Sequence, residues 1–405
     1  MLSETAKRRL LIAGFIVVVI AIALALYFVF FKAAPSEKVS DEGAADILPG
    51  SGALPGAPAA QEAARGISII ETLPASTIAT GGLTKTEVVN FSGTIAAAAG
   101  TSGDVSFLNA NDGRFYKITK DGRVVTMSDK QFFGVDELKW NDDKNKTIME
   151  FPDGSNVYFD FDKQKQVTLP KHWEEFNFAQ NDDHIAAKSL GDGREDNWLI
   201  TANPDGSGAR ALEPLGSVAD KVTVSYAPNG QTVAFSETGE PVGGERQSIL
   251  LIGKNGENLP KLIVDGTGFL PNWSPGGKKL VYSTVHTKDS WNPRLYVVNG
   301  QGDSIGSAKR DLGLNTWADK CTFANEFEMF CAVPSQLEAG MGLERSLANF
   351  VPDSIVKVDI RNGAKTEIGR PEFNISIRNI STDGDLSQLF LTDAVTGALH
   401  KMRLK

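Results

Sequence analysis

The sequence predicts an all-β protein, a β-propeller of four-stranded antiparallel blades, preceded by one N-terminal transmembrane helix. Three observations predict this fold. A phrase of an apolar residue, a polar turn and a short apolar strand recurs along the chain, a second hairpin follows each copy, and an uncharged run of 22 residues lies near the N-terminus. Such a repeat indicates one supersecondary unit that buries its apolar faces against its neighbours.

The recurring phrase is clearest at residues 272–283, which read Asn-Trp-Ser-Pro-Gly-Gly-Lys-Lys-Leu-Val-Tyr-Ser, and at residues 226–236. Each copy reads as one hairpin, because a polar turn separates two short apolar segments. More divergent copies lie at residues 140–151, 178–187, 323–332 and 380–392.

A second hairpin follows each copy, with turns such as Asn255-Gly256 that tolerate positive φ. Its leading strands are expected at residues 115–118, 157–161, 198–201, 249–252, 295–298, 355–360 and 399–404. Lys117 and Lys401 occupy equivalent positions 284 residues apart, which is six steps of about 47 residues. Four strands at this period are typical of propeller blades. The spacing predicts seven blades, and six remain open because the copy before residue 130 lacks a clear first hairpin.

The last copy holds only three strands up to Lys405, so we expect a strand from the N-terminal side to close the propeller. Residues 67–71 (Ile-Ser-Ile-Ile-Glu) and residues 86–90 (Thr-Glu-Val-Val-Asn) are both suitable. We expect the first of these to be the closing strand.

The aromatic-Ser-Pro-x-Gly-x-x-aliphatic-aromatic phrase resembles the TolB-like, WD-related propeller repeat of bacterial envelope proteins. The resemblance is strong at residues 226–236 and 272–283 and covers most of residues 85–405. It implies a propeller fold and an envelope setting. It specifies function poorly, because such propellers serve in binding, in scaffolding and, with additional domains, in peptidases.

Residues 10–31, from Leu10 to Phe31, are uncharged and largely aliphatic, long enough to cross a bilayer as a helix. Lys7, Arg8 and Arg9 precede this run, which predicts that residues 1–9 are cytoplasmic and that the propeller lies outside. The alternative is a cleaved secretory signal, whose apolar region is usually about 7–15 residues. We expect an uncleaved anchor in the plasma (inner) membrane. Whether the outer compartment is a periplasm or the cell surface is left open.

Residues 32–66 are rich in Ala, Gly, Pro, Ser and acids, which predicts a flexible linker. Residues 67–405 then form the propeller domain. The chain carries a net charge of −9, and the charged residues that flank the membrane helix are net positive, so the part beyond it is more acidic still. This balance excludes nucleic acid as the main partner.

Cys321 and Cys331 are the two cysteines of the chain, and they flank a hairpin centred near Glu326. A symmetric register would place them opposite each other, within reach of a disulfide. Two small buried thiols are the alternative.

The residues expected for catalysis or metal binding do not form a known motif. The four histidines lack metal-ligand spacing, and there is no Cys-x-x-Cys. Residues 302–306 match Gly-x-Ser-x-Gly, but they fall in a short turn with no α/β domain after it. The acid-rich stretches 109–113 and 192–197 do not fit a calcium loop. The sequence predicts no catalytic residue, no cofactor and no metal.

The loops between the second and third strands of a blade, and the connections between blades, share one face of a propeller. The longest such loops fall at residues 189–197, 237–247, 284–294 and 333–354. We call this side the long-loop face; its connections carry the aromatics Phe132, Phe133, Trp173, Phe269 and Trp317. Loops on a rigid scaffold favour binding, although each aromatic could instead pack between blades. The candidate binding residues are Arg194, Trp291, Arg294, Arg246, His286, Trp317, Leu337, Met341, Arg345 and Phe350.

Residues 333–354 form the longest of these loops, with a short helix expected from about Gln336 to Asn349. The loop is either a docking element or a lid folded over the propeller mouth. Gly340 and Gly342 weaken the helix.

Two functions are consistent with this pattern. The first is a non-catalytic, membrane-tethered, extracytoplasmic propeller that binds an envelope protein or a cell-wall glycan through its long-loop face. The alternative is a glycan lyase or hydrolase in the central mouth, with His286, Asp289, Arg246 and Glu195 as the residues to test.

Overall fold

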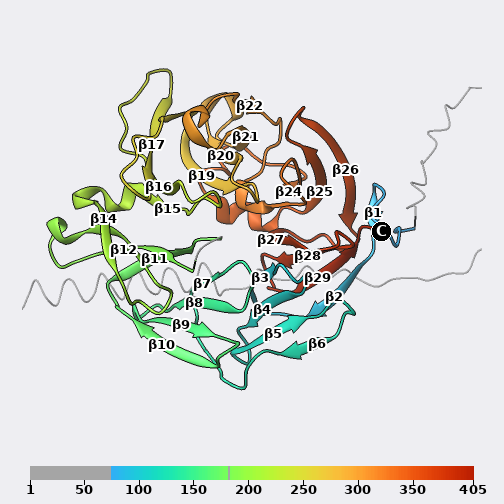
Figure 1. The fold of residues 1–405 in the computed structure, drawn as a ribbon. Helices are drawn as coiled ribbons and strands as arrows, with labels where there is room; N and C mark the ends of the chain where they lie inside the picture. The colour runs from blue at the N-terminus through green and yellow to red at the C-terminus, as the bar shows by residue number, and fades with distance from the viewer. Residues whose placement is uncertain (1–73, 181–182) are drawn as a thin grey trace, which may run out of the picture. The chain divides into compact units, whose positions relative to one another are not determined.

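The computed structural model describes residues 74–180 and 183–405, which form seven antiparallel sheets arranged around a central axis (Figure 1). Each sheet is one blade, with its first strand innermost. The seven-bladed prediction is therefore confirmed, and the six-bladed alternative is wrong.

The first three blades run from residue 94 to residue 214. Blade 1 contains β3 (Thr94–Ala99), β4 (Val105–Asn109), β5 (Arg114–Ile118) and β6 (Val124–Thr126). Blade 2 contains β7 (Glu137–Trp140), β8 (Lys146–Glu150), β9 (Asn156–Asp160) and β10 (Lys165–Leu169). Blade 3 contains β11 (Trp173–Phe178), β12 (Ile185–Ser189), β13 (Trp198–Ala202) and β14 (Arg210–Pro214).

The remaining blades run from residue 222 to the C-terminal region. Blade 4 contains β15 (Val222–Val224), β16 (Thr232–Ser236), β17 (Arg246–Gly253) and β18 (Leu262–Asp265). Blade 5 contains β19 (Thr267–Trp273), β20 (Lys279–Val285), β21 (Pro293–Asn299) and β22 (Arg310–Asp311). Blade 6 contains β23 (Cys321–Phe323), β24 (Glu328–Pro334), β25 (Asp353–Asp359) and β26 (Ala364–Pro371). Blade 7 contains β27 (Ile377–Thr382), β28 (Gln388–Asp393) and β29 (Leu399–Arg403).

The closing strand of blade 7 is β2 (Thr86–Asn90), which pairs antiparallel with β29. The expectation that residues 67–71 close the propeller is wrong, and those residues lie outside the described part of the chain. β2 has the advantage of position, because only three residues separate it from the first strand of blade 1. A further strand, β1 (Leu83–Thr84), pairs parallel with the outer edge of β26 and was not expected.

The second strand of each blade has at least three consecutive buried residues, because neighbouring blades cover both of its faces. In β8, Ile148 packs in a cluster with residues of blade 3, whereas the next residue, Met149, packs with residues of blade 1. Between blades 4 and 5, Phe235 packs against Phe269 and Trp273, with ring centres 5.1 and 5.6 Å away. Stacked blades thus bury one apolar layer at each blade interface.

An asparagine precedes the apolar residue of the recurring phrase in blades 3, 5 and 7, and each one links two blades. The side chain of Asn272 donates to the carbonyls of Ala318 and Cys321, at 2.8 and 3.0 Å. Asn379 donates to Ala97 O at 2.6 Å, and Asn177 accepts from the backbone N–H of residue 226. These contacts join the innermost strands to neighbouring blades and so hold the blades that carry the long loops.

Six short 3₁₀ helices occupy the connections of the described residues: η1 (Arg194–Asp196), η2 (Gly216–Lys221), η3 (Thr287–Asp289), η4 (Gly302–Ser304), η5 (Ala318–Lys320) and η6 (Arg345–Phe350). The helix expected over residues 336–349 is absent from the structure, where only η6 forms. Gly340 has φ of +90°, which a right-handed helix does not allow.

Cys321 and Cys331 lie directly opposite each other on β23 and β24 and form a disulfide, with 4.0 Å between their Cα atoms. The structure therefore has the disulfide and not the two separate thiols. The predicted membrane helix, residues 10–31, and the linker, residues 32–66, lie outside the described residues. Within the described residues, no helix is long and apolar enough to cross a membrane.

Candidate binding face

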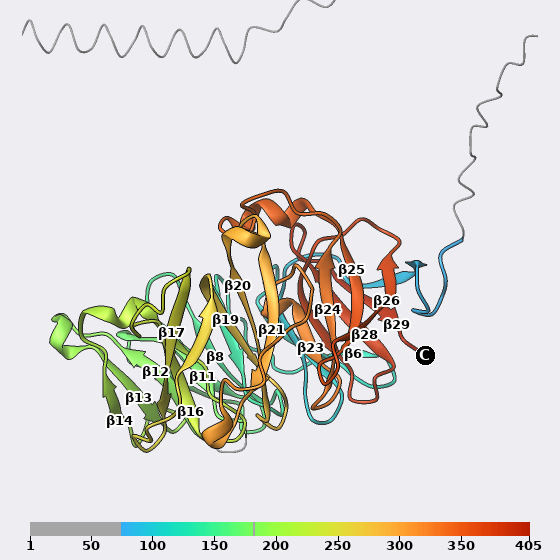
Figure 2. The ribbon, with the colours of Figure 1, turned by 90° about the horizontal axis from the view of Figure 1, so that it is seen from above.

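The four longest loops between second and third strands lie on one side of the propeller. They connect β12 to β13, β16 to β17, β20 to β21 and β24 to β25. Figure 2 shows the loops that follow β20 and β24 rising on the same side. The blade connections that contain η2 and η5 belong to this side as well, because they join a fourth strand to the next first strand.

The loop of residues 335–352 folds back over its neighbours on this face. The N–H groups of Gly340 and Gly342 donate to the carbonyls of Ser290 and Trp291, at 2.8 and 2.9 Å. The hydroxyl of Ser376 donates to the carbonyl of Ala348 at 3.2 Å. Hydrogen bonds therefore hold the backbone of the loop against neighbouring connections, as expected for a lid. The side chains of Leu343, Leu347 and Phe350 remain exposed, as expected for a docking element.

Exposed apolar side chains concentrate on the long-loop face. Thirteen large hydrophobic residues of the described chain are exposed, and nine of them are on this face: Phe91, Phe133, Val242, Trp291, Leu343, Leu347, Phe350, Phe373 and Val395. The other four, Leu83, Val124, Val125 and Leu250, lie on strands. Among the described residues, the turns of the opposite face carry none.

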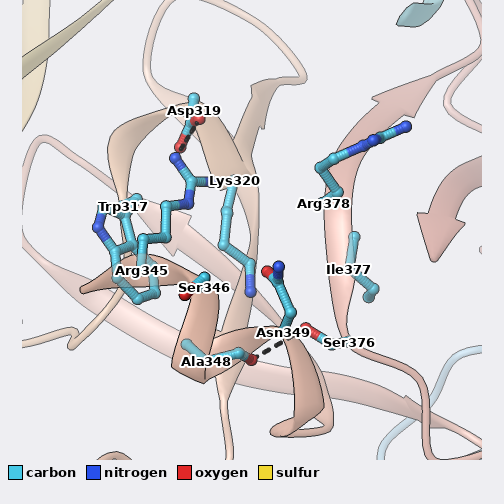
Figure 3. A pocket seen from close by; sticks show the side chains of 10 residues that line it. All are labelled: Trp317, Asp319, Lys320, Arg345, Ser346, Ala348, Asn349, Ser376, Ile377 and Arg378. Carbon is cyan, nitrogen blue, oxygen red and sulfur yellow. Dashed lines mark hydrogen bonds and ion pairs between the residues drawn. The ribbon is translucent and has the colours of Figure 1, made fainter. Parts of the chain in front are cut away.

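Two of the predicted binding residues, Trp317 and Arg345, meet at a pocket of about 390 Å³ (Figure 3). The guanidinium carbon of Arg345 lies 5.0 Å from the ring centre of Trp317, and its Nη1 lies 2.7 Å from Asp319 Oδ2. Further lining residues are Lys320, Ser346, Ala348, Asn349, Ser376, Ile377 and Arg378. The pocket thus combines an aromatic wall with several cationic side chains.

A buried ion pair lies beneath this pocket. Lys320 Nζ lies 2.7 and 2.8 Å from the two carboxylate oxygens of Asp353, which also accepts from the backbone N–H of Ile377 at 2.5 Å. Burial lowers the pKa of Lys320, and the Asp353 carboxylate opposes that shift. Asp353 is buried and does not line the pocket, so its ion pair with Lys320 lies inside the fold.

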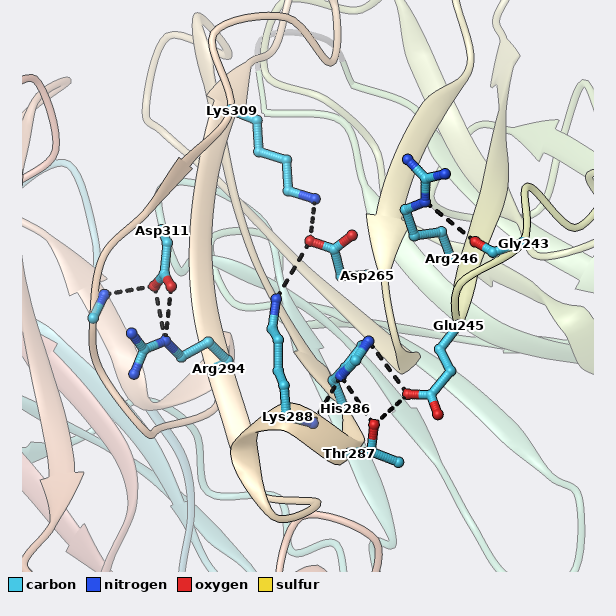
Figure 4. Close-up of polar contacts among 11 residues, drawn as sticks. Gly243, Glu245, Arg246, Asp265, His286, Thr287, Lys288, Arg294, Lys309 and Asp311 are labelled. Carbon is cyan, nitrogen blue, oxygen red and sulfur yellow. Dashed lines mark hydrogen bonds and ion pairs between the residues drawn. The ribbon is translucent and has the colours of Figure 1, made fainter.

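Two other predicted residues, His286 and Arg246, lie at a second cluster, between blades 4 and 5, where they hold loops in place (Figure 4). His286 Nδ1 accepts from the N–H of Lys288 at 2.9 Å, so its proton is on Nε2, which lies 3.3 Å from Glu245 Oε2. Arg246 Nε donates to the carbonyl of Gly243 at 3.2 Å.

Arg294, also in this cluster, pairs with Asp311 at 2.8 Å. Lys288 and Lys309 both approach Asp265, at 3.6 and 2.8 Å, and lie over the ring of Tyr296. Every predicted residue of this second cluster therefore has a partner within blades 4 and 5: His286 and Arg246 contact the loop before β17, and Arg294 joins β21 to β22.

The remaining predicted binding residues do not line either of these two sites. Arg194 is exposed in η1 on blade 3, and Leu337 and Met341 are half-buried within the longest loop. Trp291 is 36 % exposed and Phe350 is 79 % exposed. Of the aromatics expected on the connections, only Phe133 is exposed; Phe132, Trp173, Phe269 and Trp317 are buried.

The residues of the enzymatic alternative are not assembled into one site. His286 and Asp289 share one loop, whereas Glu195 lies in η1 on another blade. In the described part of the chain, the contacts of His286 and Arg246 are with Glu245 and Gly243, and no three His, Cys, Asp or Glu side chains form a possible metal site.

Sequence reasoning missed the other polar residues that line the pocket, Asp319, Lys320, Ser346, Asn349, Ser376 and Arg378, and it missed Asp353 beneath them. A signal for Lys320 exists, since it directly precedes the buried strand β23 and so sits where an apolar residue is expected. Nothing in the sequence links it to Asp353, which is 33 residues away.

No protein-family model and no curated relative matches this chain. Solved structures do match over most of it. An oligogalacturonate lyase in complex with manganese has a TM-score of 0.52 at 14 % identity, covering 78 % of this chain and 91 % of that one. An oligogalacturonate lyase from Vibrio parahaemolyticus has a TM-score of 0.51 at 10 % identity, covering 79 % and 91 %. The β-propeller domain of Cps50 (Swd1) from Myceliophteria thermophila has a TM-score of 0.53 at 10 % identity, covering 79 % and 100 %.

The chain has the fold of a seven-bladed β-propeller. At these identities the likeness shows the fold alone, which is both TolB-like and WD-repeat-like. Lyases and other propellers resemble it equally, so the likeness does not separate an enzyme from a non-catalytic domain.

Proposed function

We propose that this protein is a non-catalytic propeller, tethered to a membrane and placed outside the cytoplasm, that binds an envelope protein or a cell-wall glycan through its long-loop face. One observation carries the proposal: nine of the thirteen exposed large hydrophobic residues of the described chain lie on that face. Soluble domains rarely expose apolar groups in one region unless the region contacts a partner.

The apolar groups are densest over blades 5 and 6. Leu343 is 60 % exposed, Leu347 is 53 % exposed, and Phe350 and Trp291 accompany them. Aromatic and arginine side chains around a pocket are the usual anchors of protein interfaces, and Trp317 with Arg345 supplies such a pair. We therefore place the centre of the interface on this part of the face.

Two further features support the proposal. His286, Arg246 and Arg294 each contact a neighbouring residue of blades 4 and 5, which supports a centre of the interface elsewhere on the face. The Cys321–Cys331 disulfide is typical of compartments outside the cytoplasm. The membrane tether rests on the sequence of residues 10–31.

A capture experiment with two matched variants tests the interface. Leu347→Ser with Phe350→Ser removes apolar groups from the face, whereas Val124→Ser with Val125→Ser removes exposed apolar groups from β6, away from the face. After cross-linking in intact cells, a partner retained by the β6 variant and lost by the face variant supports the proposal. Equal recovery by both variants contradicts it.

A glycan lyase is the second candidate, because two of the similar structures are oligogalacturonate lyases. The manganese of the first has no counterpart among the described side chains here, where no three His, Cys, Asp or Glu residues form a metal site. Incubation with oligogalacturonate, followed by detection of unsaturated product, tests this candidate. Turnover that is lost in His286→Ala, with an unchanged unfolding midpoint, would establish the enzyme and overturn the non-catalytic proposal.

A further inference from the structure

The pocket between Trp317 and Arg378 differs in charge from the rest of the acidic chain. Its lining contains three cationic side chains, Lys320, Arg345 and Arg378, and one carboxylate, Asp319; with Asp353, which pairs with Lys320 beneath the pocket, the excess is one positive charge. Figure 3 shows Arg345 beside Trp317, with its guanidinium directed at Asp319, and Lys320 between Arg345 and Arg378. A local excess of positive charge in a net negative protein favours an anionic ligand.

The three cations differ in how firmly they are held. Lys320 is fixed by Asp353 inside the fold, and Arg378 donates to the carbonyl of Thr94 at 2.9 Å. Arg345 is paired with Asp319 at the surface, where both side chains are partly exposed, at 37 % and 44 %. Exposed ion pairs contribute little to stability because water competes for both charges. Arg345 is therefore the cation whose present partner, Asp319, an incoming anion can replace.

Arg345 is also pre-oriented for this exchange. Its guanidinium lies against the ring of Trp317, which restricts the plane of its N–H donors. A planar guanidinium matches the two oxygens of a carboxylate better than a point charge does. Asp319 occupies the position that a ligand carboxylate would take.

Along η6, the residues that line the pocket alternate with two exposed apolar side chains, which we call the apolar rim. Leu347 and Phe350 lie on η6, the same 3₁₀ helix that supplies Arg345 and Ala348, and they are 53 % and 79 % exposed. A ligand that places a carboxylate in the pocket would bring its adjacent groups against these two side chains. Apolar side chains of a peptide suit this rim better than the hydroxyl groups of a sugar acid, whose hydrogen bonds would be lost there.

We propose that the pocket binds a carboxylate of a peptide segment, which displaces Asp319 from Arg345, while apolar side chains next to that carboxylate pack on Leu347 and Phe350. This inference rests on the proposed function, because it assigns the chemistry of the partner at the centre of the long-loop face. The carboxylate is either the side chain of an acidic residue or the C-terminus of the peptide.

The test uses the full chain and an array of nonapeptides in which every carboxylate-bearing member has a neutral amide twin. One set carries internal Glu or Asp, and a second set ends in a free C-terminus, so the array identifies the source of the carboxylate. We expect bound peptides to have an apolar residue beside the carboxylate and to bind at least about tenfold more tightly than their amide twins. Equal binding of both twins would overturn the proposal.

Two substitutions with opposite effects separate a binding role from a folding defect. Arg345→Gln should weaken the binding of acidic peptides about tenfold and remove the difference in affinity between each acidic peptide and its amide twin. Asp319→Asn should strengthen the binding of acidic peptides several-fold, since it removes the carboxylate that competes for Arg345. Weaker binding in Asp319→Asn, or unchanged binding in Arg345→Gln, would contradict the displacement.

The opposite face provides a matched control. Arg361 lies 5.5 Å from the ring centre of Phe327 and pairs with Asp359 at 2.8 Å, in the turns of the same blade. Arg361→Gln and Asp359→Asn should leave peptide binding unchanged. If they change it as the pocket variants do, the effect is a general one of charge and the pocket is not the site.

Two outcomes separate this inference from the proposed function. A cellular partner lost in the Leu347→Ser, Phe350→Ser variant but retained in Arg345→Gln would sustain the binding face and refute the carboxylate pocket. Competition by digalacturonate, with no selected peptide, would assign the carboxylate to a sugar acid and refute the peptide.

Discussion

Lys320 and Asp353 form a buried ion pair in which each side chain is almost fully enclosed. Asp353→Asn would leave the ammonium group of Lys320 buried without a counter-charge. We expect a loss of about 3–5 kcal/mol in the free energy of unfolding, which is the usual cost of removing one member of a buried pair. Urea denaturation measures this loss.

The exposed pair Arg123–Asp121 is the control for that substitution. Asp121→Asn should produce no resolvable change in the urea midpoint. If Asp353→Asn and Asp121→Asn behave alike, the Lys320–Asp353 pair does not support the floor of the pocket.

Glu150 gives a pH-dependent prediction. Burial, together with the facing carboxylate of Glu137, raises the pKa of Glu150 to about 7 from an ordinary value of 4.5. The group is then protonated in the folded chain and ionised in the unfolded chain between these values, so stability falls as pH rises from 4.5 to about 7. Glu150→Gln should be neutral at pH 4.5 and stabilising by about 1–2 kcal/mol at pH 8, after allowance for partial exposure. The same effect at both pH values would contradict the shift.

At the residue scale, the sequence predicted two lining residues of the pocket and missed most of the others. The location of Arg345 and Trp317 on one face was predictable because long loops and blade connections share that face. Asp319 and Lys320 were not, because a charge next to a strand is usually solvated, and the burial of Lys320 depends on a partner in another strand. The contacts of His286, Arg246 and Arg294 with Glu245, Gly243 and Asp311 were not predictable either, since these partners become visible only in the structure.

At the element scale, β2 decides whether the propeller is closed. It supplies the outer strand of blade 7 through its ladder with β29, and β1 covers part of the edge of β26. A chain that begins at Pro74 keeps both strands, one that begins at Lys85 loses β1 alone, and one that begins at Phe91 loses both.

Thermal unfolding of these three chains should show a graded result. We expect full stability from Pro74, a lower midpoint from Lys85, and loss of the cooperative transition from Phe91, because blade 7 would then have an open edge. A stable, cooperative chain from Phe91 would contradict the assignment of β2 as the closing strand.

Most elements were predictable because the phrase repeats, and the exceptions have physical causes. The first hairpin of blade 1 was missed because β3 reads Thr-Ile-Ala-Ala-Ala-Ala, and alanine has low β propensity. The closing strand was misplaced because two segments had similar alternation, although only β2 lies directly before β3 in the chain. The helix in the longest loop was wrong because left-handed Gly340 interrupts it.

At the scale of the whole molecule, we propose that one chain carries both a membrane anchor and a binding face. Residues 10–31 predict that the chain remains in the membrane fraction after alkaline carbonate extraction. Protease added outside intact cells or spheroplasts should digest the propeller, whereas a tag before Met1 should be protected. Release by carbonate, or protection of the propeller, would contradict the tethered orientation.

The repeat determined the architecture of the propeller, but the exposed apolar groups of one face could not be located from the sequence. Of the connection aromatics, four are buried and only Phe133 is exposed, because a propeller needs large side chains between its blades as well as at interfaces. The burial of each aromatic, which only the fold reveals, distinguishes side chains that pack between blades from those that are exposed.

The most direct measurement of the central claim is photo-cross-linking in intact cells from a reactive amino acid placed at Phe350, on the long-loop face, or at Val124, on β6. Both positions are exposed, at 79 % and 46 %, so both variants should fold and react with whatever lies beside them. We predict one defined adduct from position 350 and none from position 124. The same adducts from both positions, or none from position 350, would contradict a binding role for the long-loop face.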